Sequence, residues 1–114
     1  MNEANDDLMV TRVVHHKAKA GREARFLQMM VEVSAAWKNQ LPEITVTPYK
    51  SATSERGVYV VLVKLRAANL HHFDEWTGAA LEKEWGVAET ETFLAEYYDC
   101  LEDSHQIAVV TEAL

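Results

Sequence analysis

The chain has 114 residues, of which 48% are hydrophobic and 25% are charged, and its formal net charge at pH 7 is −7. This is ordinary globular composition, and the length suffices for one hydrophobic core. No cluster of lysine and arginine is present, which argues against nucleic acid or an anionic membrane as partner. The single cysteine, Cys100, excludes an internal disulfide. No signal-peptide pattern and no membrane-length apolar run are visible, so we expect a cytoplasmic protein.

The first part of the chain predicts a strand followed by a long helix. Residues 1–7 are polar and acidic, and we expect them to form a disordered tail. Residues 8–17 are rich in β-branched side chains and predict a first strand. Between Arg22 and Gln40, apolar residues recur at spacings of three and four, which predicts an amphipathic helix. Gly21 is expected to cap its start, and Pro42 prevents its continuation.

Two strands joined by a loop are predicted next. Residues 43–50 alternate apolar and polar side chains, and Pro48 indicates an edge strand because proline cannot donate to a ladder. Residues 51–57 have the composition of a loop. Residues 57–66 carry apolar side chains at both odd and even positions. A strand with one face in water should alternate, so this strand is predicted to be covered on both faces.

The last part of the chain predicts two helices and a strand. Asn69 is expected to cap a second helix, which Gly86 ends. A third helix is predicted over residues 90–102 and a fourth strand over residues 105–111. The order predicts an α+β protein with the ferredoxin-like split βαβ fold: a four-stranded antiparallel sheet with helices on one face. We expect a single domain over residues 8–114, in which the first and third strands are central.

The apolar character of both faces of residues 58–65 also predicts a partner. Helices cover only one face of such a sheet, and the other face would expose a large apolar patch in a monomer. Burial against a second copy of the chain is the simplest arrangement. We therefore expect a symmetric homodimer with two sheets face to face.

The element order, and the segment Gly21-Arg22-Glu23-Ala24-Arg25-Phe26 before a long helix, resemble the dimeric α+β barrel superfamily. Within it, the antibiotic-biosynthesis-monooxygenase-like family is the nearest in appearance. The resemblance implies a homodimer in which each subunit holds a small-molecule pocket between its sheet and its helices. Activities in the family include cofactor-independent oxygenation of aromatic polyketides, haem degradation and quinol oxidation. Oxygenating members tend to place an asparagine in the first strand and a tryptophan at the end of the third. This chain has no asparagine in its first strand, and its third ends Lys64-Leu65-Arg66.

Histidines are the candidate catalytic residues. His16 shares a strand face with Val10 and Val14, whereas His72 and Trp76 lie four apart on one side of a helix. A histidine beside an aromatic wall suits removal of a proton from a phenol or hydroxyquinone. We therefore take His16 and His72 as candidate catalytic residues. The candidate substrate-binding residues are Trp76, Tyr59 and His105. The alternative is that these histidines are surface or hydrogen-bonded residues.

No metal or cofactor is expected. The sequence has no His-x-x-x-His, no Cys-x-x-Cys and no run of glutamate ligands. Only the family resemblance raises haem, with a histidine of the second helix as an axial ligand. Two functions remain open. One is a cofactor-independent monooxygenase acting on an aromatic or quinol-type compound, and the other is a non-catalytic ligand-binding or interaction module.

Overall fold

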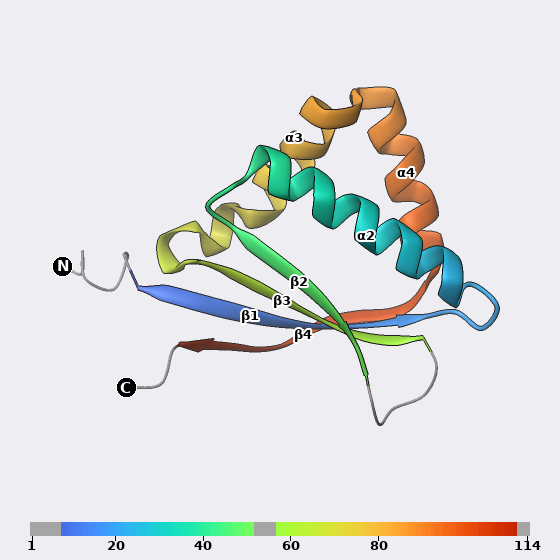
Figure 1. The fold of residues 1–114 in the computed structure, drawn as a ribbon, viewed down its shortest axis with the longest axis horizontal. Helices are drawn as coiled ribbons and strands as arrows, with labels where there is room; N and C mark the ends of the chain where they lie inside the picture. The colour runs from blue at the N-terminus through green and yellow to red at the C-terminus, as the bar shows by residue number, and fades with distance from the viewer. Residues whose placement is uncertain (1–7, 52–56, 112–114) are drawn as a thin grey trace.

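A computed structural model describes residues 8–51 and 57–111; the predicted tail over residues 1–7 and most of the predicted 51–57 loop lie outside this part of the chain. The order of elements is β1 (Met9–Ala18), α2 (Glu23–Gln40), β2 (Thr45–Lys50), β3 (Val58–Arg66), the 3₁₀ helix η1 (Ala67–His72), α3 (Phe73–Trp85), α4 (Val87–Asp99) and β4 (Leu101–Thr111) (Figure 1). The strands form one antiparallel sheet in the order β2-β3-β1-β4. This is the predicted ferredoxin-like fold, with β1 and β3 central.

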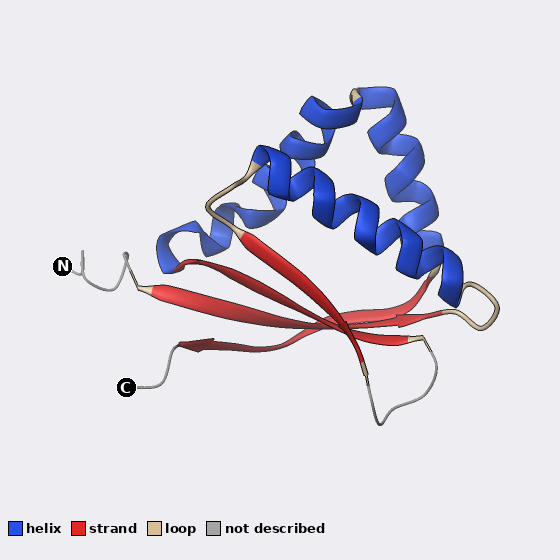
Figure 2. Ribbon diagram, in the orientation of Figure 1, coloured by secondary structure: helices blue, strands red, loops and turns tan. Residues whose placement is uncertain are grey.

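All the helices lie on one face of the sheet, as Figure 2 shows. On β3, the side chains of Tyr59, Val61, Val63 and Leu65 point to this face and are buried. They meet the buried stripe of α2, which consists of Phe26, Met29, Met30, Val33 and Ala36. The helical period of α2 and the alternation of β3 thus produce two apolar surfaces that bury each other.

The opposite face of the sheet carries apolar side chains that none of the described helices covers. Val58, Val60 and Leu62 alternate with the buried residues of β3 and are half-buried in the single chain. Their cross-strand neighbours on the same face include Val13, opposite Leu62, and Tyr49, opposite Val60. Tyr49 is 52% exposed. One apolar face of β3 is therefore covered by helices, and the other is open in a single chain. The predicted cover of this second face stays a prediction.

Several predicted helix boundaries were wrong. Arg22, and not Gly21, is the N-cap of α2; Gly21 instead forms a turn with φ +86° and donates its backbone N–H to the Glu23 carboxylate. Asn69 lies inside η1, and His72 is the N-cap of α3. Gly86 does end α3, as predicted.

The boundary between the last helix and the last strand also differs from the prediction. α4 ends at Asp99, three residues before the predicted end, and β4 begins at Leu101. The reason is tertiary: the carbonyl of Cys100 accepts the backbone N–H of Lys19, and Leu101 pairs with Ala18. Pairing with the end of β1 thus draws these residues into the sheet. Within residues 8–51 and 57–111, no helix is long and apolar enough to cross a membrane.

Candidate functional site

A cavity of about 180 Å³ lies between the sheet and the helices. Its sheet wall includes Val14, Val61 and Val63, and its helix wall includes Met30 and Val33 of α2. Aromatic side chains of α2, α3 and α4 complete it: Trp37, Phe73, Tyr97 and Tyr98. The wall of this cavity is mostly apolar and also carries polar side chains, which is the composition of a small-molecule site.

His16 is the histidine that lines this cavity. Its Nδ1 atom lies 2.8 Å from the Ser104 hydroxyl of β4, with which it shares a hydrogen bond. The ring meets Phe26 at 5.7 Å and Tyr97 at 6.4 Å between centroids, both in edge-on geometry. Burial, and secondarily the neighbouring His15, lowers the pKa of His16 to about 4. His16 is therefore a neutral hydrogen-bonding group at pH 7.

Arg12 brings a positive charge to the same cavity, and the sequence reasoning missed it. Its Nε donates to the Gln106 side-chain oxygen at 2.8 Å, and its guanidinium carbon lies 5.0 Å from the centre of the Phe73 ring. The missed signal was simple alternation: Arg12 lies two residues before Val14 and four before His16, so all three share one strand face. An arginine over an aromatic ring can bind a planar anion.

Tyr97 and Asp74 are further polar groups at this cavity. Tyr97 is buried, and burial raises the pKa of its phenol, with Tyr98 adding to the effect. The phenol thus stays protonated and can donate a hydrogen bond. Asp74 is exposed in the first turn of α3, at the rim.

The other predicted site residues do not line this cavity. His72 is exposed and stacks on Trp76, with ring centroids 5.6 Å apart and an interplanar angle of 15°. Tyr59 is buried beside Phe26, and its hydroxyl donates to the Glu23 carbonyl at 3.4 Å. His105 lies in β4 opposite His15, on the face of the sheet away from the helices. The structure thus brings His16, but not the other four, to the cavity wall.

A larger and more open groove of about 410 Å³ lies on the helical side of the molecule. It has an aromatic pair, Trp85 and Phe93, with ring centroids 4.6 Å apart. Three carboxylates surround the pair, from Glu32, Glu84 and Glu89. This acidic groove repels anions and is accessible to water, so it suits an anionic aromatic compound less well than the cavity does.

No family model matches the chain, and no curated protein matches it either. The likeness lies in the fold. The sheet order and the helical layer define a ferredoxin-like α+β fold that the chain shares with antibiotic-biosynthesis-monooxygenase-like structures. The resemblance expected from the sequence is thereby confirmed at the level of the fold.

Three solved structures illustrate the likeness. A candidate antibiotic biosynthesis monooxygenase from Caulobacter crescentus has a TM-score of 0.66 and 18% identity, with 96% of this chain and 93% of that chain covered. A NIPSNAP family protein from Agrobacterium tumefaciens has a TM-score of 0.69 and 12% identity, with 93% and 87% covered. SnoaB from Streptomyces nogalater, a cofactor-independent oxygenase, has a TM-score of 0.61 and 16% identity, with 93% and 94% covered.

Proposed function

We propose that the protein binds a small aromatic compound with an acidic hydroxyl group in the cavity between the sheet and the helices. The observation that carries this proposal is the placement of Arg12 and His16 on one otherwise apolar strand face of the cavity. Apolar walls exclude water, and that strengthens the attraction between a guanidinium and an anion. The neutral imidazole of His16 adds a hydrogen-bond partner for the hydroxyl or for a neighbouring carbonyl.

The volume of the cavity limits the size of the compound. An apolar cavity of about 150 Å³ holds one benzene molecule. At about 180 Å³, this cavity accommodates one aromatic ring with its substituents. A quinol or hydroxyquinone therefore fits better than a polycyclic compound.

The proposed reaction is a cofactor-independent monooxygenation of such a compound. Arg12 would stabilise the phenolate, which is the electron-rich form that reduces O₂. A phenol plus O₂ gives a quinone plus water. One oxygen atom stays on the ring carbon, and the other leaves as water with the hydroxyl hydrogen and the hydrogen of that carbon. The substrate supplies all the electrons, so no external reductant is needed. SnoaB, named a cofactor-independent oxygenase, has the same fold and supports this proposal.

Binding without turnover is the second candidate. The pKa of His16, at about 4, makes its imidazole a weak general base at pH 7, because such a base should have a pKa near the working pH. His72, the other proposed catalytic histidine, is exposed and stacks on Trp76. A site of this kind can hold an anion by charge and shape alone.

One experiment tests the binding site. The coloured one-ring acid 2,5-dihydroxy-1,4-benzoquinone is titrated into the protein at pH 7 and followed by absorbance and calorimetry. We expect Arg12→Gln to weaken binding by about tenfold or more, since a hydrogen bond to a charged group contributes about 1.5–3 kcal/mol. Lys83→Gln, which makes the same change in charge on the exposed surface of α3, should bind like the unchanged protein. Equal affinity of the Arg12 variant would reject the site.

A second experiment separates the two candidates. Oxygen consumption is measured with a set of one-ring phenols and quinols, alongside analysis of the product and of hydrogen peroxide. One O₂ consumed per quinone formed from a phenol, without hydrogen peroxide and with the rate reduced in Arg12→Gln, supports the monooxygenase. Tight binding without oxygen consumption across the set supports the binding protein.

We also propose that the protein is a homodimer joined through the face of the sheet opposite the helices. The half-buried Val13, Val60 and Leu62 support this, because a central apolar patch with partly exposed neighbours resembles an interface. Analytical ultracentrifugation at micromolar concentration should give twice the mass of one chain. Leu62→Lys should halve that mass, whereas Val31→Lys, on the exposed surface of α2, should leave it unchanged. A monomeric unchanged protein contradicts the proposal.

A further inference from the structure

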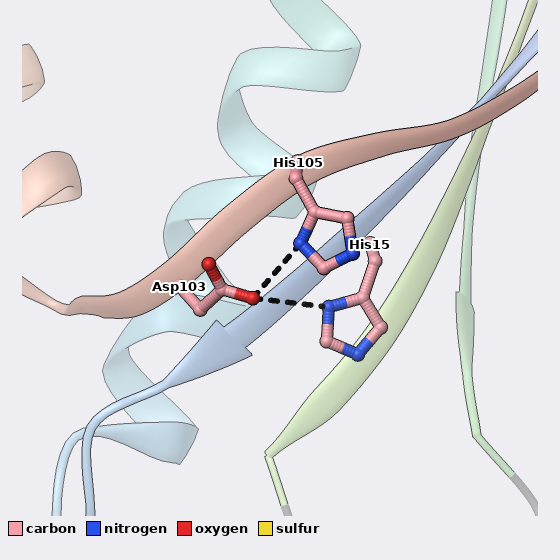
Figure 3. Close-up of side chains that lie close together, drawn as sticks. All are labelled: His15, Asp103 and His105. Carbon is pink, nitrogen blue, oxygen red and sulfur yellow. Dashed lines mark hydrogen bonds and ion pairs between the residues drawn. The ribbon is translucent and has the colours of Figure 1, made fainter.

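Three metal-ligating side chains meet on the face of the sheet that the helices leave open (Figure 3). His15 of β1 is the cross-strand partner of His105 in β4, and Asp103 lies two residues before His105. Residues two apart on a strand share a face, so the pairing of β1 with β4 places all three together. Figure 3 shows the Asp103 carboxylate directed between the two imidazole rings.

The ligand atoms of this cluster are close enough together for one metal ion to contact all three. An Asp103 carboxylate oxygen lies 2.9 Å from His105 Nδ1 and 3.8 Å from His15 Nδ1. All three ligand atoms lie within 4.8 Å of one another. Zinc bonds to nitrogen and oxygen are about 2.0–2.2 Å long, and a tetrahedral arrangement then separates its ligand atoms by about 3.3–3.6 Å. The two measured oxygen–nitrogen distances bracket this value.

The state of His15 is a second observation that points to a ligand. Its Nδ1 atom is buried and has no hydrogen-bond partner among the described residues. A buried polar atom without a hydrogen bond is destabilising, and a bond to a metal would remove this penalty. In the single chain the side chains of Asp103 and His105 are 52% and 55% exposed. The proposed homodimer would place a second copy of the chain against this face of the sheet.

We propose that His15, Asp103 and His105 form a binding site for a divalent zinc ion. Two neutral imidazoles and one carboxylate are a donor set that zinc accepts, with the fourth position left to water or to a further ligand. The site goes beyond the proposed function. It lies on the opposite face of the sheet from the cavity, and it uses none of the residues that line the cavity.

Zinc titration tests the site directly. Protein without an affinity tag is first freed of metal with a chelator, and zinc chloride is then added under calorimetry. We expect one zinc ion per chain in the unchanged protein. Asp103→Asn and His105→Ala should each weaken binding at least tenfold. His71→Ala removes an exposed histidine elsewhere and should not change the affinity.

Thermal unfolding distinguishes loss of zinc binding from misfolding of a variant. Zinc should raise the melting temperature of the unchanged protein and of His71→Ala, because a ligand that binds only the native state stabilises it. The rise should be lost in Asp103→Asn, whose replaced side chain is half exposed and isosteric. Absence of zinc binding, or binding that Asp103→Asn and His105→Ala leave unchanged, overturns the proposal. Neither outcome bears on the aromatic compound in the cavity.

Discussion

Replacing His16 with glutamine should remove most of the sensitivity of the fold to mild acid. The pKa of His16 falls from 6.5 to about 4 in the native protein. In the unfolded chain it returns to about 6.5. Between these values the unfolded state binds a proton that the native state does not, so stability falls as the pH falls. The stability that comes from the neutral His16 ring is fully present above pH 6.5. It is lost as the pH falls to 4, and below pH 4 it does not change further.

The magnitude follows from the size of this change. A difference of one unit between the pKa values in the folded and unfolded states changes the free energy of unfolding by about 1.36 kcal/mol. A lowering from 6.5 to about 4 therefore gives about 3 kcal/mol in total, most of it lost by pH 4.5. Such a loss is a large part of the stability of a small domain, which is about 5–15 kcal/mol.

The assay is urea unfolding of the protein at pH 7 and at pH 4.5, followed by circular dichroism. The unchanged protein should lose about 2–3 kcal/mol more than His16→Gln over this interval. Glu96 and Glu84, whose pKa values are lowered by hydrogen bonds from Arg25 and Gln40, contribute a smaller loss near the lower pH that both proteins share. The exposed His71→Gln should behave like the unchanged protein.

Two results would refute this reasoning. One is an equal acid-induced loss in His16→Gln and the unchanged protein. The other is an NMR titration of the His16 ring with a midpoint near 6.5, because that would place the imidazole in water rather than against Phe26 and Tyr97.

Three further predictions concern stability in urea. Gly86→Ala should lower the free energy of unfolding by about 1–3 kcal/mol, because only glycine readily adopts φ +90° with ψ 160°. Gly78→Ala, inside α3, should instead raise it by about 0.5–1 kcal/mol. Equal effects of the two substitutions would contradict the argument. Phe26→Ala removes a fully buried ring and should cost about 3–5 kcal/mol, against less than about 0.5 kcal/mol for the 56% exposed Val31→Ala. Trp37→Phe should lower the free energy of unfolding by about 1–2 kcal/mol, because it removes the 3.1 Å hydrogen bond from the indole to the Thr77 carbonyl. A fully stable variant would show that this bond contributes nothing.

The sequence was sufficient for the four strands, for the three α-helices and for the apolar faces of α2 and β3, but it did not predict η1. The stripe of α2 could be predicted because a helical period of 3.6 residues is a local property, and so could the alternation of β3. Gly86 could be predicted as a helix end because the preference of glycine for a positive φ is also a local property. The end of α4 could not, because Leu101 joins β4 through its pairing with Ala18, which is 83 residues away in the sequence.

The amino-acid sequence by itself determined the order of strands and helices, and it placed His16 on the face of its strand that becomes the wall of the cavity. Only the tertiary structure decided which distant side chains meet. The register of β1 against β4 brings His15 to His105 and Asp103, and it shifts at an irregularity between Val13 and Val14. Such a register depends on the pairing of whole strands and on their buried faces. No local pattern of residues contains that information, so the three-residue cluster could not be predicted from spacing alone.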